Sequence, residues 1–209
     1  MDIEYLSQSK IVENPNELLI LIELSNYQPS DFKLVYRATR DGFSAKSFHA
    51  RSKNKERVLA VIRSGSNVFG GYTDLSWNGN EWGYYRSDRN ALLFSFRNPS
   101  NVPSIYRQQY YNYYSIYDSS YNLLQFGSGA DLQICSNANV NYCSYSYLGN
   151  AYVYSTAYTT TYGYNYNYNS TDGYGYYSST NGYYPSNSNY FTGSNYFIVD
   201  EIELFQRSN

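Results

Sequence analysis

Tyrosine is distributed very unevenly along this chain. Of the 30 tyrosines in 209 residues, six precede residue 100 and the other 24 lie between Tyr106 and Tyr196. A tyrosine carries a large apolar ring and a hydroxyl group that needs a hydrogen-bond partner when it is buried. The second half therefore cannot pack like a core of leucine and valine, and many of its rings must lie at surfaces. Those rings would form a face for a partner, a face for self-assembly, or an inert surface.

The length and charge of the chain restrict its class. A mainly β chain of 209 residues is commonly one domain, and one domain is our expectation. With 15 basic and 17 acidic residues, the chain lacks the electrostatic signature of binding to nucleic acid or to an anionic membrane. The densest basic stretch, residues 51–57, is short and contains Glu56, so we interpret it as a solvated loop.

Neither a signal peptide nor a membrane-spanning segment is predicted. The N-terminus, Met1–Glu4, is acidic where a secretory signal would be basic. The longest apolar stretch, residues 18–24, is too short to cross a bilayer and contains Glu23. We therefore expect a cytoplasmic protein without membrane insertion, or an extracellular one if Met1 is not the native start.

The chain has two cysteines, Cys135 and Cys143, eight residues apart. This spacing fits neither a CxxC metal site nor a secreted framework of several disulfides, and we expect two reduced thiols. A disulfide stays open as the alternative for a secreted chain, as does glycosylation of Asn169 in the sequence Asn-Ser-Thr.

Short apolar runs separated by glycine turns predict an antiparallel β-sandwich with helical flanks. Asparagine, proline and glutamate at the start of an apolar run predict a helix over about 15–25, and Ser44 would cap a short helix that carries Phe48. The paired Gly70 and Gly71 indicate a bulge or a close backbone approach within a strand. Strands are expected at 32–37, 58–62, 67–73, 91–96, 126–134 and 196–205, with a tyrosine-rich hairpin around Ile105 and Ile116.

Residues 150 to 190 consist mainly of tyrosine, asparagine, glycine, serine and threonine. From Tyr162 to Tyr168 the tyrosines recur with period two, so an extended chain would place them on one face. Cross-strand aromatic pairs stabilise such a ladder by about 0.2–1 kcal/mol each. A polar loop without fixed structure fits the same composition, and both interpretations stay open. The candidate interface residues are Tyr154, Tyr158, Tyr162, Tyr164, Tyr166, Tyr168, Tyr174, Tyr176 and Tyr177.

Five sequence blocks resemble the TLDc domain family. The first is an apolar strand that runs into Thr-Arg-Asp-Gly-Phe-Ser, and the second joins a Phe-Gly-Gly-Tyr stretch to Ser-Trp. The others are similar to the family's apolar strand, its glycine turn with the following strand, and its closing strand. In order, the five blocks are residues 34–44, 67–77, 91–96, 126–134 and 197–205, and the resemblance covers about residues 10 to 206.

The resemblance implies a mainly β (α+β) fold, a two-sheet antiparallel β-sandwich flanked by short helices. We therefore expect one domain over 1–209, with its core over 10–206, and an insertion-like segment at about 150–190. The family is found in oxidation-resistance proteins and in partners of the vacuolar proton pump, as binding and regulatory modules without established catalytic residues. The chain departs from the family pattern at Ala130, where histidine is favoured, and in the long tyrosine-rich segment.

Few residues in this chain suit catalysis. His49 is the single histidine, and the resemblance places it on a packed helix. The glycine turn at 127–129 leads into a strand, whereas a phosphate cradle needs a helix N-terminus. Trp77 would lie in the core by resemblance, and an exposed tryptophan ring at Trp77 or Trp82 would stack on a sugar or a partner. We therefore expect no catalytic residue, cofactor or metal.

The charged residues are interpreted structurally. Arg37, Arg40, Asp41 and Gly42 form the expected structural turn, held by a buried Arg–Asp pair. The carboxylates that could supply oxygen ligands for calcium are Asp74, Asp131, Asp200, Glu201 and Glu203. Carboxylates that alternate with apolar residues on a strand usually form a solvated face, which is our interpretation of the last three.

Together, these observations favour a non-enzymatic protein-binding and regulatory module. The resemblance makes a subunit of the vacuolar-type proton pump, or another oxidative-stress factor, the expected partner. The alternative is a self-assembling structural subunit, a filament or a scaffold, that uses tyrosine-rich surfaces as homotypic interfaces. A third hypothesis is an enzyme or radical-quenching protein that acts through its phenols.

Overall fold

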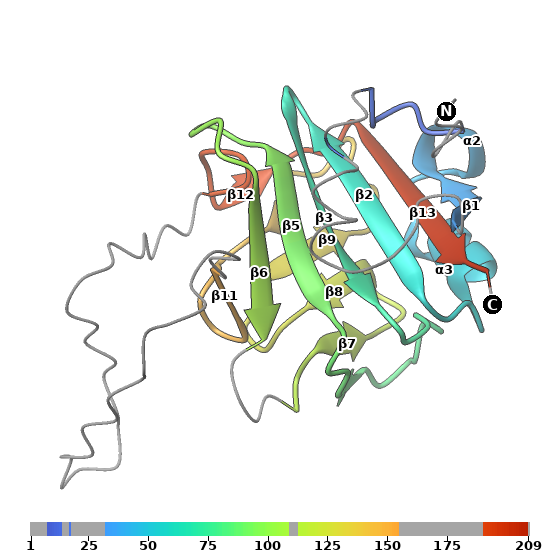
Figure 1. Cartoon of the computed structure of the whole chain (residues 1–209). Coiled ribbons are helices and arrows are strands. Elements are labelled where there is room, and N and C mark those ends of the chain that lie inside the picture. Colours follow the sequence, from blue (N-terminus) through green and yellow to red (C-terminus); the bar gives the residue numbers. More distant parts are fainter. Residues whose placement is uncertain (1–7, 14–16, 18–31, 109–112, 155–189, 209) are drawn as a thin grey trace, which may run out of the picture.

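The computed structural model of the chain describes residues 8–13, 17, 32–108, 113–154 and 190–208. These residues form two antiparallel sheets, one of seven strands and one of six, that pack face to face with two short helices at one edge (Figure 1). The expected two-sheet β-sandwich is confirmed. Among the described residues, no helix is both long and apolar enough to span a membrane.

The seven-stranded sheet has the order β1, β13, β2, β3, β5, β6, β11. All neighbouring strands in it are antiparallel. Its strands are β1 Phe32–Arg37, β2 Val58–Ser64, β3 Asn67–Thr73, β5 Leu92–Arg97, β6 Ser104–Gln108, β11 Tyr152–Tyr154 and β13 Glu201–Arg207.

The six-stranded sheet has the order β12, β10, β9, β8, β7, β4, so β12 and β4 are its two edge strands. Its strands are β4 Tyr84–Arg86, β7 Ile116–Asp118, β8 Asn122–Phe126, β9 Leu132–Cys135, β10 Ser144–Tyr145 and β12 Tyr196–Phe197. In Figure 1, β7, β8 and β9 lie behind the layer that β2, β3, β5 and β6 form.

Two sequence expectations about strands are wrong. Ile105 lies in β6 and Ile116 in β7, which belong to different sheets, so the chain between them connects the two layers and is not a hairpin turn. The closing stretch 196–205 is also not one strand, because β12 and β13 belong to different sheets and the chain changes layer at residues 198–200.

Helices α2 (Ala38–Asp41) and α3 (Ala45–Ser52) lie beside β1 at the edge of the sandwich (Figure 1). As expected, Ser44 caps α3, because its side chain accepts the N–H of Ser47 at 3.1 Å. Phe48 of α3 is fully buried and packs edge-on against Tyr36 of β1, with ring centroids 5.2 Å apart. The expected helix over 15–25 lies outside the described residues apart from Glu17.

The main core fills the space between the two sheets. Phe69 of the seven-stranded sheet stacks on Phe191, with ring centroids 4.9 Å apart, and both rings are buried. Gly70 of β3 shows why the expected close approach needs glycine. A Cβ there would lie 1.9 Å from the carbonyl oxygen of Ala60 in β2.

A second, smaller core covers the other face of the seven-stranded sheet. It includes Val61, Phe94 and Phe205, together with Ile11 from the N-terminal segment. The seven-stranded sheet is therefore buried on both faces, which explains why strand β2 reads as an apolar run without alternation.

Candidate protein-binding surface

Strand β10 and its neighbours place serine inside the protein and tyrosine outside. Ser144 pairs with Phe197 of β12, and both are buried. Tyr145 pairs with Tyr196, and the exposed fraction of Tyr196 is 50%. Side chains of directly opposite residues lie on the same face of an antiparallel pair. The two tyrosine rings therefore share the outer face of the six-stranded sheet.

Three tyrosine rings meet on this outer face. The ring centroids of Tyr145 and Tyr196 are 5.4 Å apart, and those of Tyr142 and Tyr196 are 6.4 Å apart. The exposed fraction of Tyr142 is 61%. The hydroxyl of Tyr145 donates to the carbonyl oxygen of Gly129 at 2.9 Å, and burial raises its pKa, so the ring is held in place as a neutral phenol. We call Tyr142, Tyr145 and Tyr196 the β12 tyrosine surface.

A disulfide closes the loop beside this surface. Cys135 at the end of β9 and Cys143 just before β10 are joined, with their Cα atoms 5.9 Å apart, so the expectation of two reduced thiols is wrong. The register of the strands is the reason. Gln133 pairs with Tyr145 in an antiparallel ladder, which places position 135 opposite position 143.

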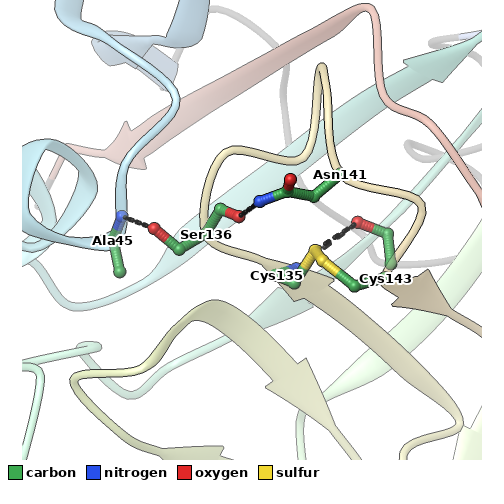
Figure 2. The surroundings of a disulfide bond; sticks show 6 residues. Ala45, Cys135, Ser136, Asn141 and Cys143 are labelled. Atoms are coloured by element: carbon green, nitrogen blue, oxygen red, sulfur yellow. Dashed lines mark hydrogen bonds between the residues drawn. A yellow bond between two sulfur atoms is a disulfide. The ribbon is translucent and has the colours of Figure 1, made fainter.

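The loop closed by the disulfide is also hydrogen-bonded to distant parts of the chain (Figure 2). The Ser136 hydroxyl accepts the N–H of Ala45 at 3.0 Å, and the Asn141 side chain donates to the Ser136 carbonyl at 3.1 Å. The carbonyl of Ala138 accepts the N–H of Val199 at 2.9 Å. The backbone that carries Tyr142 is therefore held by the start of α3, by the disulfide and by the link between β12 and β13.

The predicted structural turn at 37–42 forms, with one correction. Arg40 and Asp41 are joined at 2.7 Å, but only the Asp41 side chain is buried, with 7% exposed, whereas 48% of the Arg40 side chain is exposed. The expected buried pair is therefore buried at its carboxylate alone. The Arg40 guanidinium, together with the N–H of Arg37, holds the pKa of Asp41 below its usual range. From the core side, the Tyr36 hydroxyl donates to the Gly42 carbonyl at 2.8 Å.

Two of the carboxylates predicted to face solvent are buried instead. Glu203 accepts hydrogen bonds from Nε of Arg37 and from the N–H of Lys10, both at 2.8 Å. Glu201 accepts the N–H of Thr39 at 3.0 Å. The prediction fails because both faces of β13 are covered. Ile202 and Leu204 pack into the main core, and Phe205, on the same face as Glu201 and Glu203, packs into the second core.

Asp131 is a buried carboxylate surrounded by main-chain donors. Its Oδ1 atom accepts the N–H groups of Gly149 and Asn150 at 3.0 Å and of Tyr152 at 3.2 Å, and its Oδ2 atom accepts that of Ala151 at 2.9 Å. Burial raises the pKa of Asp131 to about 6, against the opposing effect of these hydrogen bonds. Within the part of the chain that the structure describes, no group of three or more metal-binding side chains comes together.

His49 and Trp77 are packed as the sequence predicted. His49 is buried, and its Nε2 atom lies 2.8 Å from the carbonyl oxygen of Asn122, to which it donates. Trp77 is fully buried and packs against Phe48 and Phe126. Both residues therefore stabilise the contact between α3 and the six-stranded sheet.

Only Tyr154 of the nine candidate interface tyrosines lies within the described residues. It is half-buried, and its ring centroid lies 6.0 Å from that of the buried Tyr106. Tyr190 approaches the same ring at 5.6 Å. The other eight candidates, Tyr158 to Tyr177, lie outside the described residues and stay predictions.

The β12 tyrosine surface was not among the candidate interface residues. The sequence carries a signal for it, because Tyr145 and Tyr147 alternate with Ser144 and Ser146. In a half-buried strand the larger apolar side chain is expected to face the core, and here the buried positions are the serines. The alternation of tyrosine and serine was therefore visible in the sequence, but the sequence did not show which of the two faces the core.

The paired sheets, the helices at one edge and the Arg-Asp-Gly turn together define a TLDc-type β-sandwich module. The family model for the TLDc domain matches residues 5–208, nearly the whole chain, and the chain belongs to this family. A comparison with curated proteins finds none that matches it.

Proposed function

We propose that this TLDc chain is a non-enzymatic protein-binding and regulatory module that docks a partner through the β12 tyrosine surface. The observation that carries the proposal is the cluster of Tyr142, Tyr145 and Tyr196 on a backbone fixed by a disulfide. Tyrosine provides large contact area with few torsions to immobilise, which suits an interface. Val140 and Ile198, exposed by 70% and 41%, add apolar area from neighbouring positions in the chain.

The absence of catalysis is part of the proposal, and the role of His49 supports it. Its ring contacts main-chain carbonyl groups inside the sandwich. The buried carboxylates of Glu203 and Asp131 are engaged by structural hydrogen bonds. A general acid or base needs access to substrate, which these groups lack.

Membership of the TLDc family suggests the partner. By analogy with the family, we propose a subunit of the vacuolar-type proton pump as the partner and a role in oxidative stress. We also propose a cytoplasmic location, in which the Cys135–Cys143 disulfide would have to withstand a reducing environment. Recovery of the pump's peripheral sector from lysate with the purified chain as bait is the expected result. Failure to recover any pump subunit under conditions that preserve the pump would rule out the pump as the partner.

Matched variants test the docking surface itself. Tyr142→Ser with Tyr196→Ser removes the two most exposed rings of the β12 tyrosine surface. Tyr113→Ser with Tyr121→Ser, at positions exposed by 67% and 73%, removes two rings outside it. We expect the first pair to weaken partner binding by about tenfold or more, because interface tyrosines often dominate binding energy. Equal binding by both double variants would contradict the proposal.

Self-assembly is a second candidate function, and the edge position of β12 favours it. An edge strand presents main-chain groups that can pair with another chain. Here Tyr196 of that edge also presents an exposed ring. Static light scattering should then show an apparent molar mass that increases with protein concentration. Tyr196→Ser should reduce that increase. Self-assembly would be excluded if the wild type stays a strict monomer at high concentration and its molar mass does not change in the variant with Tyr164→Ser, Tyr166→Ser and Tyr168→Ser.

A further inference from the structure

The other edge of the six-stranded sheet carries an open pocket, far from the β12 tyrosine surface in strand order. The pocket has a volume of about 440 Å³, within the usual range for small-molecule sites. It is formed where the loop before β4 meets the end of β7 and the end of α3. The residues that line it are Lys53, Asn78, Gly79, Asn80, Glu81, Trp82, Tyr84 and Asp118.

Two aromatic rings border this pocket. The exposed fraction is 90% for Trp82 and 44% for Tyr84. Asn80 shapes the loop between them and the core, because its side chain accepts the N–H of Trp82 at 2.9 Å and its carbonyl accepts the N–H of Ser120 at 2.9 Å. At 90% exposure, almost none of this large apolar ring is buried. The loop geometry fixes the backbone from which that ring projects.

Asp118 supplies an independent sign of a ligand. Its side chain is fully buried and yet lines the pocket, so it lies at the pocket base. Oδ1 accepts the N–H groups of Asn78 and Gly79 at 3.0 and 2.9 Å. Oδ2 is also buried, and within the described part of the chain it has no hydrogen-bond partner. A buried acceptor without a donor is costly, and a ligand that donates to Oδ2 would remove that cost.

The side chains around Asp118 indicate which ligand fits. Lys53, Asn78 and Asn80 supply donors, whereas Glu81 and Asp118 supply acceptors. Lys53 would repel a cationic ligand, and the carboxylates of Glu81 and Asp118 would repel an anionic one. An uncharged polyol both donates and accepts hydrogen bonds at each hydroxyl, which matches the mixture. A pyranose also has an apolar face of C–H groups that can lie on an aromatic ring.

We propose that this pocket binds a saccharide. One pyranose stacks on Trp82, and one sugar hydroxyl donates a hydrogen bond to Oδ2 of Asp118. Tyr84 extends the apolar border, so a second sugar unit can follow the first along the open side. The pocket and the β12 tyrosine surface lie on opposite edge strands of the sheet, so saccharide and protein partner can bind at the same time.

Titration with oligosaccharides of known structure tests the proposal. Cellotetraose, maltotetraose, chitotetraose and mannotetraose are added to the full chain, with binding measured by saturation-transfer difference NMR and by isothermal titration. We expect at least one to bind with a millimolar or lower Kd, and Trp82→Ala and Asp118→Asn each to weaken it about tenfold or more. Tyr113→Ala, at a 67% exposed ring outside both the pocket and the β12 tyrosine surface, is the matched control and should bind as the wild type does.

Three results would overturn the proposal. The first is no binding of any of the four oligosaccharides by the folded wild-type chain. The second is binding that Trp82→Ala leaves unchanged, which is decisive because a 90% exposed side chain can be removed without unfolding the protein, even if Asp118→Asn does not fold. The third is binding of N-acetyl-arginine amide in place of the sugars, which would make the pocket a site for a cationic peptide side chain.

Discussion

Between about pH 4 and pH 6, Asp131 should make the folded protein less stable as the pH rises. Burial raises the pKa of this carboxyl group from 3.8 to about 6 in the folded state. In that window the folded state therefore holds a proton that the unfolded state has lost. Stability falls with rising pH wherever the folded state binds more protons. The contribution of Asp131 is fully present below pH 3.8 and is lost as the pH passes 6.

The size of this effect follows from the pKa difference. A rise from 3.8 to about 6 corresponds to about 3 kcal/mol, at 1.36 kcal/mol for each pKa unit. Two influences compete here. The four main-chain N–H groups of residues 149–152 favour the carboxylate, and the loss of contact with water favours the neutral acid. Burial dominates because no cation is paired with Asp131 among the described residues.

Urea denaturation of the wild type and of Asp131→Asn, followed by the fluorescence of the buried Trp77, measures this effect. All other titrating groups contribute equally to the unfolding free energies of the two proteins, so their contributions cancel in the difference between them. That difference should change by about 2.4 kcal/mol between pH 4 and pH 7, because the unfolded carboxyl group is already more than half ionised at pH 4. If Asp131→Asn does not fold, carbon-13 NMR of the Asp131 carboxyl gives its pKa directly. A wild type that gains stability relative to the variant as the pH rises, or an NMR pKa below 3.8, would show that the N–H groups outweigh burial.

Three further changes test other parts of the fold by chemical denaturation. Gly70→Ala should destabilise the protein by about 3 kcal/mol or more, since the new Cβ would collide with the main chain of Ala60; a loss below 1 kcal/mol would mean that β2 and β3 are further apart. Arg37→Met should cost about 3–5 kcal/mol because it leaves the buried Glu203 without its cation, and Glu203→Gln in the same chain should restore part of the loss. Cys135→Ser should cost about 2–3 kcal/mol through the lost loop closure, and thiol titration of the unreduced wild type should find no free thiol.

The strands that form the centre of the seven-stranded sheet could be predicted from local sequence. Strand β2 is a run of β-branched and apolar residues, and such a run indicates a strand that is covered on both faces. The cap at Ser44 and the close approach at Gly70 were also readable, because each depends on the chemistry of one residue. These features are local, and the structure confirms them.

The features that the sequence did not predict depend on distant partners. Glu203 is buried because Arg37, 166 positions away, neutralises it, and no local pattern carries that information. The disulfide follows from the register of β9 and β10, which a spacing of eight residues does not determine. The β12 tyrosine surface likewise depends on Tyr196, which reaches Tyr145 only after the chain has changed sheets.

The contacts of Tyr106 also have a consequence for how this protein can diverge. The rings of Tyr154 and Tyr190 both lie against it, so the two described residues on either side of positions 155–189 are held close together. Because the two ends already meet, the number of residues between them can change at little thermodynamic cost, growing only with the logarithm of the length. Selection can therefore lengthen, shorten or rewrite this stretch while the sandwich stays the same. A tyrosine-rich sequence could have accumulated here without any change elsewhere in the fold.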